Sequence, residues 1–126
     1  MPVYGAGTAN SEYEVITGNS MQFIGLVNTP YQLYISDPEY GVVSSVASQG
    51  YHTIALHPHI AGNWNRSLVY PKMQFEKFYA LDVNWPEQQQ YQNTIRWCTS
   101  DRASYDMLID QYKAKGHKRI CYLVSL

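Results

Sequence analysis

The sequence lacks an excess of charge of either sign, and it lacks any long apolar run. Its 126 residues include nine Lys and Arg against ten Asp and Glu, which gives a net charge of −1. Nucleic-acid-binding proteins usually carry a basic surplus that releases counterions from the phosphate backbone, so this class is disfavoured. No apolar run approaches the ~20 residues that a membrane-spanning helix needs. We therefore expect no nucleic acid among the partners of this chain.

Cysteine is also scarce, with only Cys98 and Cys121. They do not form a Cys-x-x-Cys pair, which disfavours a structural zinc site, and their spacing leaves both a disulfide and two free thiols open. Hydrophobic residues make up 45% of the chain and charged residues 15%, too apolar a balance for a disordered segment. At this length the composition indicates one folded domain with a single core.

The pattern of caps and apolar residues predicts short helices alternating with short strands. We expect helices at 9–17, 37–50, 64–70 and 101–115, strands at 53–57, 75–81 and 119–126, and loops at 19–36 and 82–99. The last strand is apolar on both faces, which is typical of a parallel sheet, so we predict an α/β protein. The chain stops inside this strand and starts just before its first helix. We therefore expect a fragment of a larger domain, cut at both ends.

Local signals define the ends of three of these helices. Thr8 and Gly18 bracket the first, and Asp37-Pro38 and Gly50 bracket the second, as N-cap and C-cap residues. Ser100 caps the helix at 101–115. Four residues are expected to form the apolar face of that helix: Tyr105, Leu108, Ile109 and Tyr112.

Thr8 is the first candidate for chemistry. The small residues Gly5-Ala6-Gly7 lead into a helix start, where backbone N–H groups attract anions and glycines let a phosphate approach closely. A hydroxyl at this position suits a nucleophile beside a bound phosphate. The alternative is an ordinary threonine N-cap, which is the commoner use of such a residue.

A second group of candidates follows the strand at 53–57. His57 stands at its carboxyl end, where open α/β sheets place ligand contacts, and we expect it to form hydrogen bonds there. Trp64 and Arg66 lie within one turn of each other, so that an indole wall and a guanidinium fork could hold a small phosphate ester. The alternative is a Trp packed in the core and an Arg in a surface ion pair.

These segments together resemble a known family. The stretch from Gly7 to Ser20 is similar to the segment that holds the nucleophilic threonine of lipoteichoic acid synthase-like phosphoglycerol transferases, which belong to the sulfatase and alkaline phosphatase superfamily. The segments 50–58 and 64–70 resemble the strand and the Trp-Asn-Arg motif of those enzymes, and 100–115 resembles their next helix. The resemblance implies that residues 1–126 are part of a sulfatase-like catalytic domain, with three α/β/α layers around a mostly parallel sheet.

The resemblance also implies the roles of individual residues. Thr8 is the expected nucleophile and a ligand of a divalent metal ion, typically manganese, whose other ligands lie outside this chain. His57, Trp64 and Arg66 are the expected glycerol-phosphate pocket. The donor is expected to be phosphatidylglycerol or a related lipid, and the acceptor a cell-envelope polymer or glycan. The full-length enzyme is expected in the cell membrane with its catalytic domain outside, and the fragment itself is expected to be soluble and inactive alone.

Two positions differ from the characterised lipoteichoic acid synthases. Gly7 replaces a lysine, and His59 replaces an acid two residues after the pocket histidine, which favours a related branch of the family. Two other functions stay open. One is a sulfatase or phosphoethanolamine transferase, although sulfatases generally use a modified cysteine or serine where this chain has Thr8. The other is a non-catalytic glycan-binding module that uses Trp64 and the 12 tyrosines.

Overall fold

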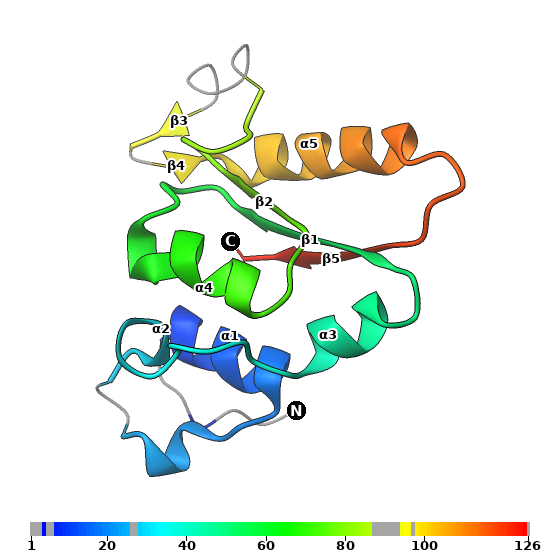
Figure 1. The fold of residues 1–126 in the computed structure, drawn as a ribbon. Coiled ribbons are helices and arrows are strands. Elements are labelled where there is room, and N and C mark those ends of the chain that lie inside the picture. Colours follow the sequence, from blue (N-terminus) through cyan, green and yellow to red (C-terminus); the bar gives the residue numbers. More distant parts are fainter. Residues whose placement is uncertain (1–3, 5–6, 26–27, 87–93, 97, 126) are drawn as a thin grey trace.

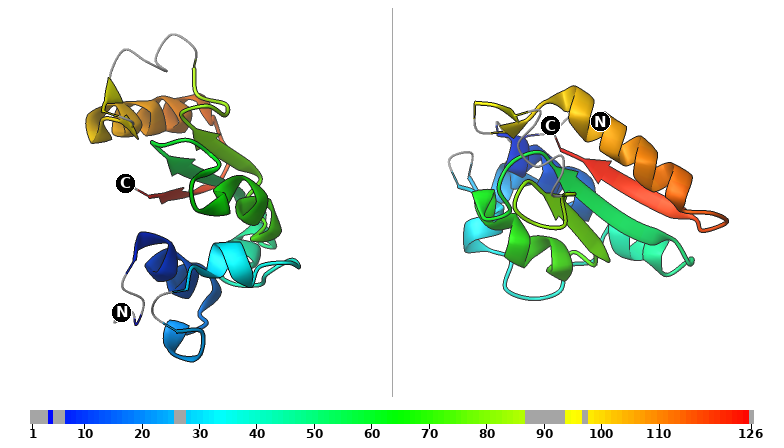
Figure 2. Two further views of the ribbon diagram at one scale, coloured as in Figure 1. Left: turned by 90° about the vertical axis from the view of Figure 1, so that its left-hand side faces the viewer. Right: turned by 90° about the horizontal axis from the view of Figure 1, so that it is seen from above.

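The structure, a computed structural model, describes residues 4, 7–25, 28–86, 94–96 and 98–125. Within these residues a parallel three-stranded sheet lies between α5 on one side and the other α-helices on the opposite side (Figures 1 and 2). The sheet has the order β2-β1-β5, with β1 at His52–His57, β2 at Lys77–Ala80 and β5 at Ile120–Val124. The predicted α/β class and the parallel pairing of the strands are confirmed.

The helices and the remaining strands follow the chain in a simple order. They are α1 (Thr8–Thr17), η1 (Met21–Phe23), α2 (Pro30–Leu33), α3 (Val42–Ala47), η2 (Asn63–Asn65), α4 (Arg66–Lys72), β3 (Thr94–Ile95), β4 (Cys98–Thr99) and α5 (Asp101–Ala114). Helix α4 leads from β1 to β2 on one face of the sheet, and α5 leads from the β3–β4 hairpin to β5 on the other (Figure 1).

Two apolar clusters fill the space on either side of the sheet. The larger one joins the sheet residues Ala55 and Phe78 to the inner faces of α1, α3 and α4. The smaller one joins Ile54, Leu56 and Tyr79 to Met107 of α5. Because side chains alternate along a strand, Thr53, Ala55 and His57 share one face of β1, and His57 therefore points toward α1 and α4.

The local caps behave largely as the sequence predicts. Gly18 takes the left-handed conformation that ends α1, with φ of 76°, and Ser100 accepts a hydrogen bond from the N–H of Ala103 at the start of α5. Thr8 differs, because Gly7 is the N-cap and Thr8 is the first helical residue. Both cysteines, Cys98 and Cys121, are free thiols.

Tertiary contacts override several other predictions. Helix α3 starts at Val42 rather than near Asp37, because the N–H of Glu39 donates to the carbonyl of Lys72 and holds the preceding segment against α4. The predicted loop 19–36 contains η1 and α2, and 82–99 contains the β3–β4 hairpin, with 87–93 and 97 outside the described residues. Helix α4 also continues through Pro71 to Lys72, two residues beyond the predicted end.

The predicted apolar face of α5 is wrong in its orientation. Tyr105, Ile109 and Tyr112 are exposed, by 47%, 47% and 59%, whereas Ala103 and Met107 are buried. Small and slender side chains let the helix lie close to the sheet, and the tyrosines remain on the outer face. The helical period was therefore predicted correctly, but its phase was not.

Gly41 lets the start of α3 touch the end of α1, and this contact predicts a stability effect. A Cβ at Gly41 would lie 2.0 Å from the carbonyl oxygen of Ile16 and 2.9 Å from the Cα of Thr17. We expect Gly41→Ala to lower the free energy of unfolding by about 1–3 kcal/mol, because backbone atoms must move apart. Urea unfolding measures this. Gly62→Ala is the matched control, because a Cβ there meets nothing within 4 Å; equal losses for the two variants would contradict the prediction.

Candidate functional site

Thr8 lies at the exposed start of α1, between two surface hollows. The first N–H groups of a helix have no partner within the helix, so they carry partial positive charge toward whatever lies in front of them. Gly7, the N-cap residue, has no side chain that could cap these groups. This arrangement places a hydroxyl beside a natural position for an anion.

The first of the two, which we call the Trp64 hollow, has a volume of about 150 Å³. The backbone at the start of α1 forms one side of it, and an indole forms another. Its lining residues are Gly7, Thr8, Ala9, Asn10, Asn28, Thr29 and Trp64. Trp64 is 42% exposed, so it is a wall of this hollow rather than a core residue.

The backbone that presents Trp64 is strained. Trp64 and Asn65, the last two residues of η2 before α4, both have left-handed conformations, with φ of 56° and 63°. A bulky residue rarely adopts this region, and such strain persists only where surrounding contacts enforce it, often at functional sites. One such contact is the amide Nδ2 of Asn65, which donates to the carbonyl of Tyr31 at 3.2 Å.

The second, which we call the Ser125 hollow, has a volume of about 280 Å³ and lies between α1 and the carboxyl end of β5. Its lining residues are Thr8, Ser11, Glu12, Val15, Leu123, Val124 and Ser125. Thr8 is common to both hollows. It therefore occupies the ridge between them, where its hydroxyl can be reached from either side.

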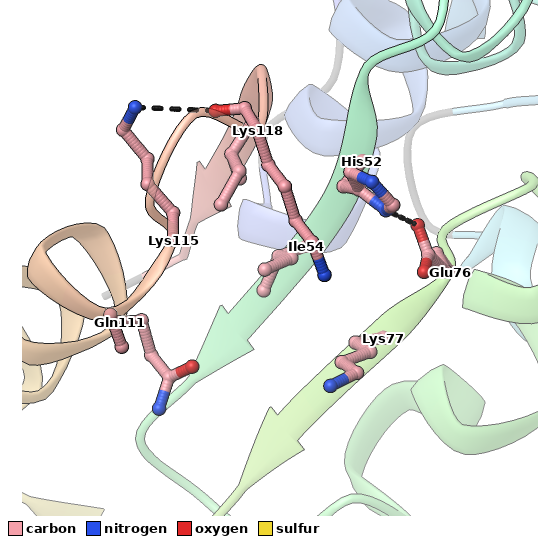
Figure 3. A pocket seen from close by; sticks show the side chains of 9 residues that line it. His52, Ile54, Glu76, Lys77, Gln111, Lys115 and Lys118 are labelled. Carbon is pink, nitrogen blue, oxygen red and sulfur yellow. Dashed lines mark hydrogen bonds and ion pairs between the residues drawn. The ribbon is translucent and has the colours of Figure 1, made fainter.

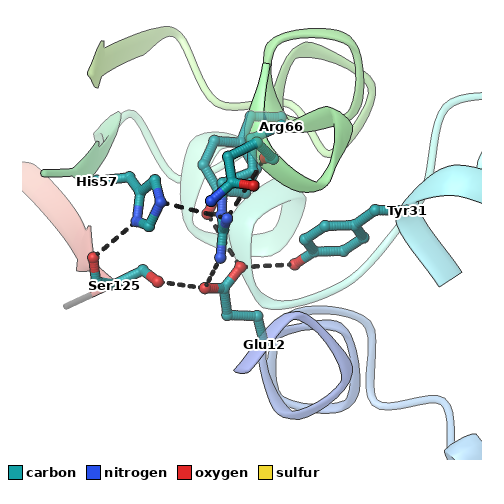
Figure 4. A network of polar contacts seen from close by, with 7 residues as sticks. Glu12, Tyr31, His57, Arg66 and Ser125 are labelled. Carbon is teal, nitrogen blue, oxygen red and sulfur yellow. Dashed lines mark hydrogen bonds and ion pairs between the residues drawn. The ribbon is translucent and has the colours of Figure 1, made fainter. Parts of the chain in front are cut away.

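Arg66 lies directly behind this ridge and is fully buried, with 0% exposure. Its Nη2 donates to Glu12 Oε1 at 2.7 Å, its Nε donates to the hydroxyl of Tyr70 at 3.0 Å, and its Nη1 lies 3.3 Å from His57 Nε2 (Figure 4). Burial opposes the charged form, but the hydrogen bonds and the charge of Glu12 outweigh it and raise the pKa of Arg66. The guanidinium of Arg66 is thus paired with the carboxylate of Glu12.

Both ring nitrogens of His57 are engaged. Nδ1 lies 3.0 Å from the carbonyl oxygen of Ser125, which can only accept, so Nδ1 carries the proton and Nε2 accepts from Arg66 (Figure 4). Burial, together with the positive charge of Arg66, lowers the pKa of His57 from 6.5 to about 4. The imidazole is consequently neutral at ordinary pH and acts as a fixed hydrogen-bonding group.

Two buried tyrosines complete the surroundings of Glu12. The hydroxyls of Tyr31 and Tyr70 donate to Glu12 Oε2 at 3.1 Å and 3.0 Å. Burial and then the negative charge of Glu12 raise the pKa of both phenols, so both remain protonated donors. Sequence reasoning does not single out Glu12, whereas the folded chain buries it.

The described residues do not hold a metal ion by themselves. Nowhere in the ranges that the structure describes do three His, Cys, Asp or Glu side chains gather closely enough to ligate one. Thr8 would contribute a single oxygen, and a divalent cation needs several ligands. The predicted metal therefore depends on residues beyond those described. Likewise, no helix in the described part of the chain is long and apolar enough to cross a membrane.

A third hollow lies at the opposite end of the strands, between α5 and the sheet (Figure 3). It measures about 150 Å³, and Lys77, Lys115 and Lys118 contribute to its lining. His52 lies here with its Nδ1 2.6 Å from a carboxylate oxygen of Glu76. None of the candidate residues Thr8, His57, Trp64 and Arg66 lines this hollow.

Comparison with known proteins identifies the family of this chain. The sequence profile of the Sulfatase family matches residues 2–126. The chain belongs to the sulfatase family. Members of this superfamily are enzymes, phosphoglycerol transferases among them, and they generally depend on metal ions. The predicted family is therefore confirmed.

Two solved structures share the fold. The lipoteichoic acid synthase LtaP from Listeria monocytogenes matches with a TM-score of 0.75 and 26% identity, over 98% of this chain and 29% of LtaP. The Streptococcus pyogenes phosphoglycerol transferase GacH, in complex with sn-glycerol-1-phosphate, matches with a TM-score of 0.67 and 25% identity, over 96% of this chain and 32% of GacH. A curated protein of Rhizobium meliloti (strain 1021), whose name assigns it to cyclic beta-1,2-glucan modification, is 36% identical over 88 residues, which is 70% of this chain and 14% of that protein.

The fold brings the four predicted site residues to one end of the sheet but in different environments. Thr8 and Trp64 share a hollow, while His57 and Arg66 lie buried behind Thr8 and contact each other. Sequence reasoning assigned no role to the other members of the buried network, which are Glu12, Tyr31, Tyr70 and Ser125. The available signal was the spacing of Glu12, four residues after Thr8 and so on the same helical face.

The pKa of His57 predicts how stability depends on pH. Between about 6.5 and about 4 the unfolded chain binds a proton at His57 and the folded chain does not. The contribution of His57 to the free energy of unfolding is therefore fully present above pH 6.5 and is lost as the pH falls toward 4. At 1.36 kcal/mol per pH unit, the loss is at most about 3 kcal/mol. Urea unfolding from pH 7 to 4.5 should show a shallower loss for His57→Gln than for the wild type. Equal slopes would contradict the buried neutral imidazole.

The contacts of Arg66 predict that even its replacement by lysine destabilises the fold. A lysine keeps the charge, but one ammonium cannot point at Glu12, Tyr70 and His57 at once. We expect Arg66→Lys to lower the free energy of unfolding by about 1–3 kcal/mol. The control is Arg102→Lys on α5, whose side chain is 93% exposed and 4.0 Å from Asp106, and which should melt like the wild type. A wild-type melting curve for Arg66→Lys would show that the buried network is not as described.

Proposed function

We propose that this chain is the nucleophile-bearing part of a phosphoglycerol transferase that modifies a cell-envelope glycan. The observation that carries the proposal is the shared hollow of Thr8 and Trp64, in a fold similar to that of GacH, which was solved with sn-glycerol-1-phosphate. A hydroxyl at a helix start next to an indole wall suits a small phosphate ester with a carbon body. Residues 1–126 would then be one part of a sulfatase-like catalytic domain.

The proposed reaction has two displacement steps at phosphorus. In the first, Thr8 Oγ forms a bond to the phosphorus of the donor lipid and loses its proton, while the bond to the diacylglycerol oxygen breaks and that oxygen takes up a proton. In the second, a glycan hydroxyl forms the new bond to phosphorus and loses its proton, while the bond to Thr8 Oγ breaks and that oxygen takes up a proton. The N–H groups at the start of α1 would stabilise the negative charge of the phosphoryl oxygens in both steps.

The proposed donor is phosphatidylglycerol or a related lipid. Trp64 would cover the glycerol carbons, and His57 and Arg66 would supply the polar side of the same pocket. Both groups are buried and neither lines the Trp64 hollow, so their side chains would have to move to contact the substrate. The similarity of LtaP and GacH to this chain supports a glycerol-phosphate partner over an ethanolamine or sulfate ester.

A glycan acceptor is favoured over a polymer of glycerol phosphate by the curated relative. The Rhizobium meliloti protein is named for the modification of a cyclic glucan, and it is 36% identical to this chain over the matched 88 residues. We propose that the full-length enzyme acts outside the cell membrane, where such a lipid and such a glycan meet. A divalent cation, manganese in our proposal, would be held by Thr8 together with ligands from outside this chain, and it would add positive charge at the phosphoryl group.

The proposal predicts that Thr8 is essential in the full-length enzyme. Thr8→Ala should lower the transfer of glycerol phosphate from phosphatidylglycerol to a glucan by more than about 10³-fold, because no atom remains to form the first bond. Mass spectrometry of the wild type, mixed with donor alone, should detect a phosphoglyceryl group on Thr8.

The matched control is Thr17→Ala at the other end of α1, where the hydroxyl donates to the carbonyl of Tyr13 and accepts from the N–H of Asn19. It should keep its activity. Transfer that survives in Thr8→Ala would reduce Thr8 to a structural residue. Glucan binding without any transfer by the wild type would favour the non-catalytic glycan-binding module.

A further inference from the structure

Glu12 has an unusually complete set of partners for a buried carboxylate. It is 8% exposed and lies one helical turn beyond Thr8 on α1. Its Oε1 accepts from Arg66 Nη2 and from the hydroxyl of Ser125, and its Oε2 accepts from the hydroxyls of Tyr31 and Tyr70 (Figure 4). A carboxylate offers about four acceptor positions, so those of Glu12 are filled.

The donors come from three different parts of the fold. Arg66 and Tyr70 belong to α4, Tyr31 belongs to α2, and Ser125 follows β5. His57 closes a ring, because it contacts Arg66 through Nε2 and the carbonyl of Ser125 through Nδ1. One carboxylate on α1 thus connects the helix that carries Thr8 with the carboxyl ends of β1 and β5.

The same contacts reach Trp64 by two routes. Arg66 follows Trp64 by two residues, and its guanidinium is held by Glu12. Tyr31, also held by Glu12, accepts at its carbonyl oxygen from the side chain of Asn65, next to Trp64. The strained backbone at Trp64 and Asn65 is therefore fixed from both sides by partners of Glu12.

We propose that Glu12 is a positioning residue, whose carboxylate holds the hydroxyl of Thr8 and the indole of Trp64 in the relative position that transfer requires. This inference rests on the proposed function. Because its acceptor positions are filled, Glu12 does not touch the reacting atoms and serves neither as a base nor as a ligand. Its effect on catalysis passes through Arg66, Tyr31 and Ser125.

Glu14 provides a matched control on the same helix. It is also buried, at 4% exposure, and its carboxylate accepts from the backbone N–H groups of Tyr4 and Met21 at 2.7 Å and 2.8 Å. These partners lie on the side of α1 away from α4. Glu14→Gln and Glu12→Gln therefore both remove a buried charge, but only Glu12→Gln disturbs the residues that position Trp64.

The experiment uses the full-length enzyme labelled with 5-fluorotryptophan, with the Trp64 resonance assigned by Trp64→Phe. Turnover is measured per folded molecule, well below the melting temperature of each variant. We expect Glu12→Gln to lower kcat about 100-fold, the size of effect that a misplacement of about 1 Å produces, and to shift the fluorine resonance of Trp64. Glu14→Gln should lower the melting temperature but keep kcat within about threefold and leave the Trp64 resonance in place.

If Glu12→Gln does not fold, Tyr31→Phe decides the question, because it removes one donor to Glu12 and keeps the charged pair. It should lower kcat about 3- to 10-fold and shift the Trp64 resonance. An unmoved resonance, or a kcat per folded molecule equal to that of Glu14→Gln, would show that Glu12 only stabilises the fold. The fluorine resonance of Trp64 tests the positioning role of Glu12 even if the wild type transfers no glycerol phosphate. That absence of transfer would overturn the proposed function instead.

Discussion

The rest of the structure depends on the buried ion pair between Glu12 and Arg66. Removing two charges from water is costly, and their attraction offsets that cost only if the remaining donors and acceptors are satisfied. Here Tyr31, Tyr70 and Ser125 satisfy the carboxylate, while Tyr70 and His57 satisfy the guanidinium. Losing either charge would strand the other in the interior. The pair therefore forces α1 and α4 into one arrangement, in which the apolar contacts of Tyr13, Val69 and Tyr70 also become possible.

This arrangement explains why the exposed residues of the site can be few. Thr8 and Trp64 are the first residues on the solvent side of a rigid network, so neither needs further partners to be held in position. The left-handed backbone at Trp64 costs free energy, on the order of 1–3 kcal/mol, which the contacts of its neighbours Asn65 and Arg66 offset. Strain at an exposed indole has no evident benefit for folding. A requirement that the indole of Trp64 faces a ligand would explain this strain.

What the sequence could predict was local. Gly18 and Ser100 end and begin their helices through contacts within a few residues, and the apolar run of β1 indicates a buried strand whatever lies beside it. What it could not predict depended on partners far along the chain. The start of α3 is set by a hydrogen bond from Glu39 to Lys72, and Glu12 is bonded to Ser125, 113 residues away. Motif resemblance singles out Thr8, Trp64 and Arg66 as candidates, but it gives no indication of which of them the fold buries.

The burial of Arg66 changes which groups can supply positive charge at the site. An open guanidinium would have supplied the positive charge for a phosphate, but this one is balanced by Glu12. Among the described residues that line the Trp64 and Ser125 hollows there is no Lys, Arg or His. The N–H groups at the start of α1 are then the positive partial charges nearest to Thr8, equivalent to roughly half an elementary charge. A phosphodiester carries a full negative charge, and more develops on its oxygens during transfer. The remaining positive charge would have to come from beyond the described residues, which is the physical reason for including a divalent cation beside Thr8 in the proposed enzyme.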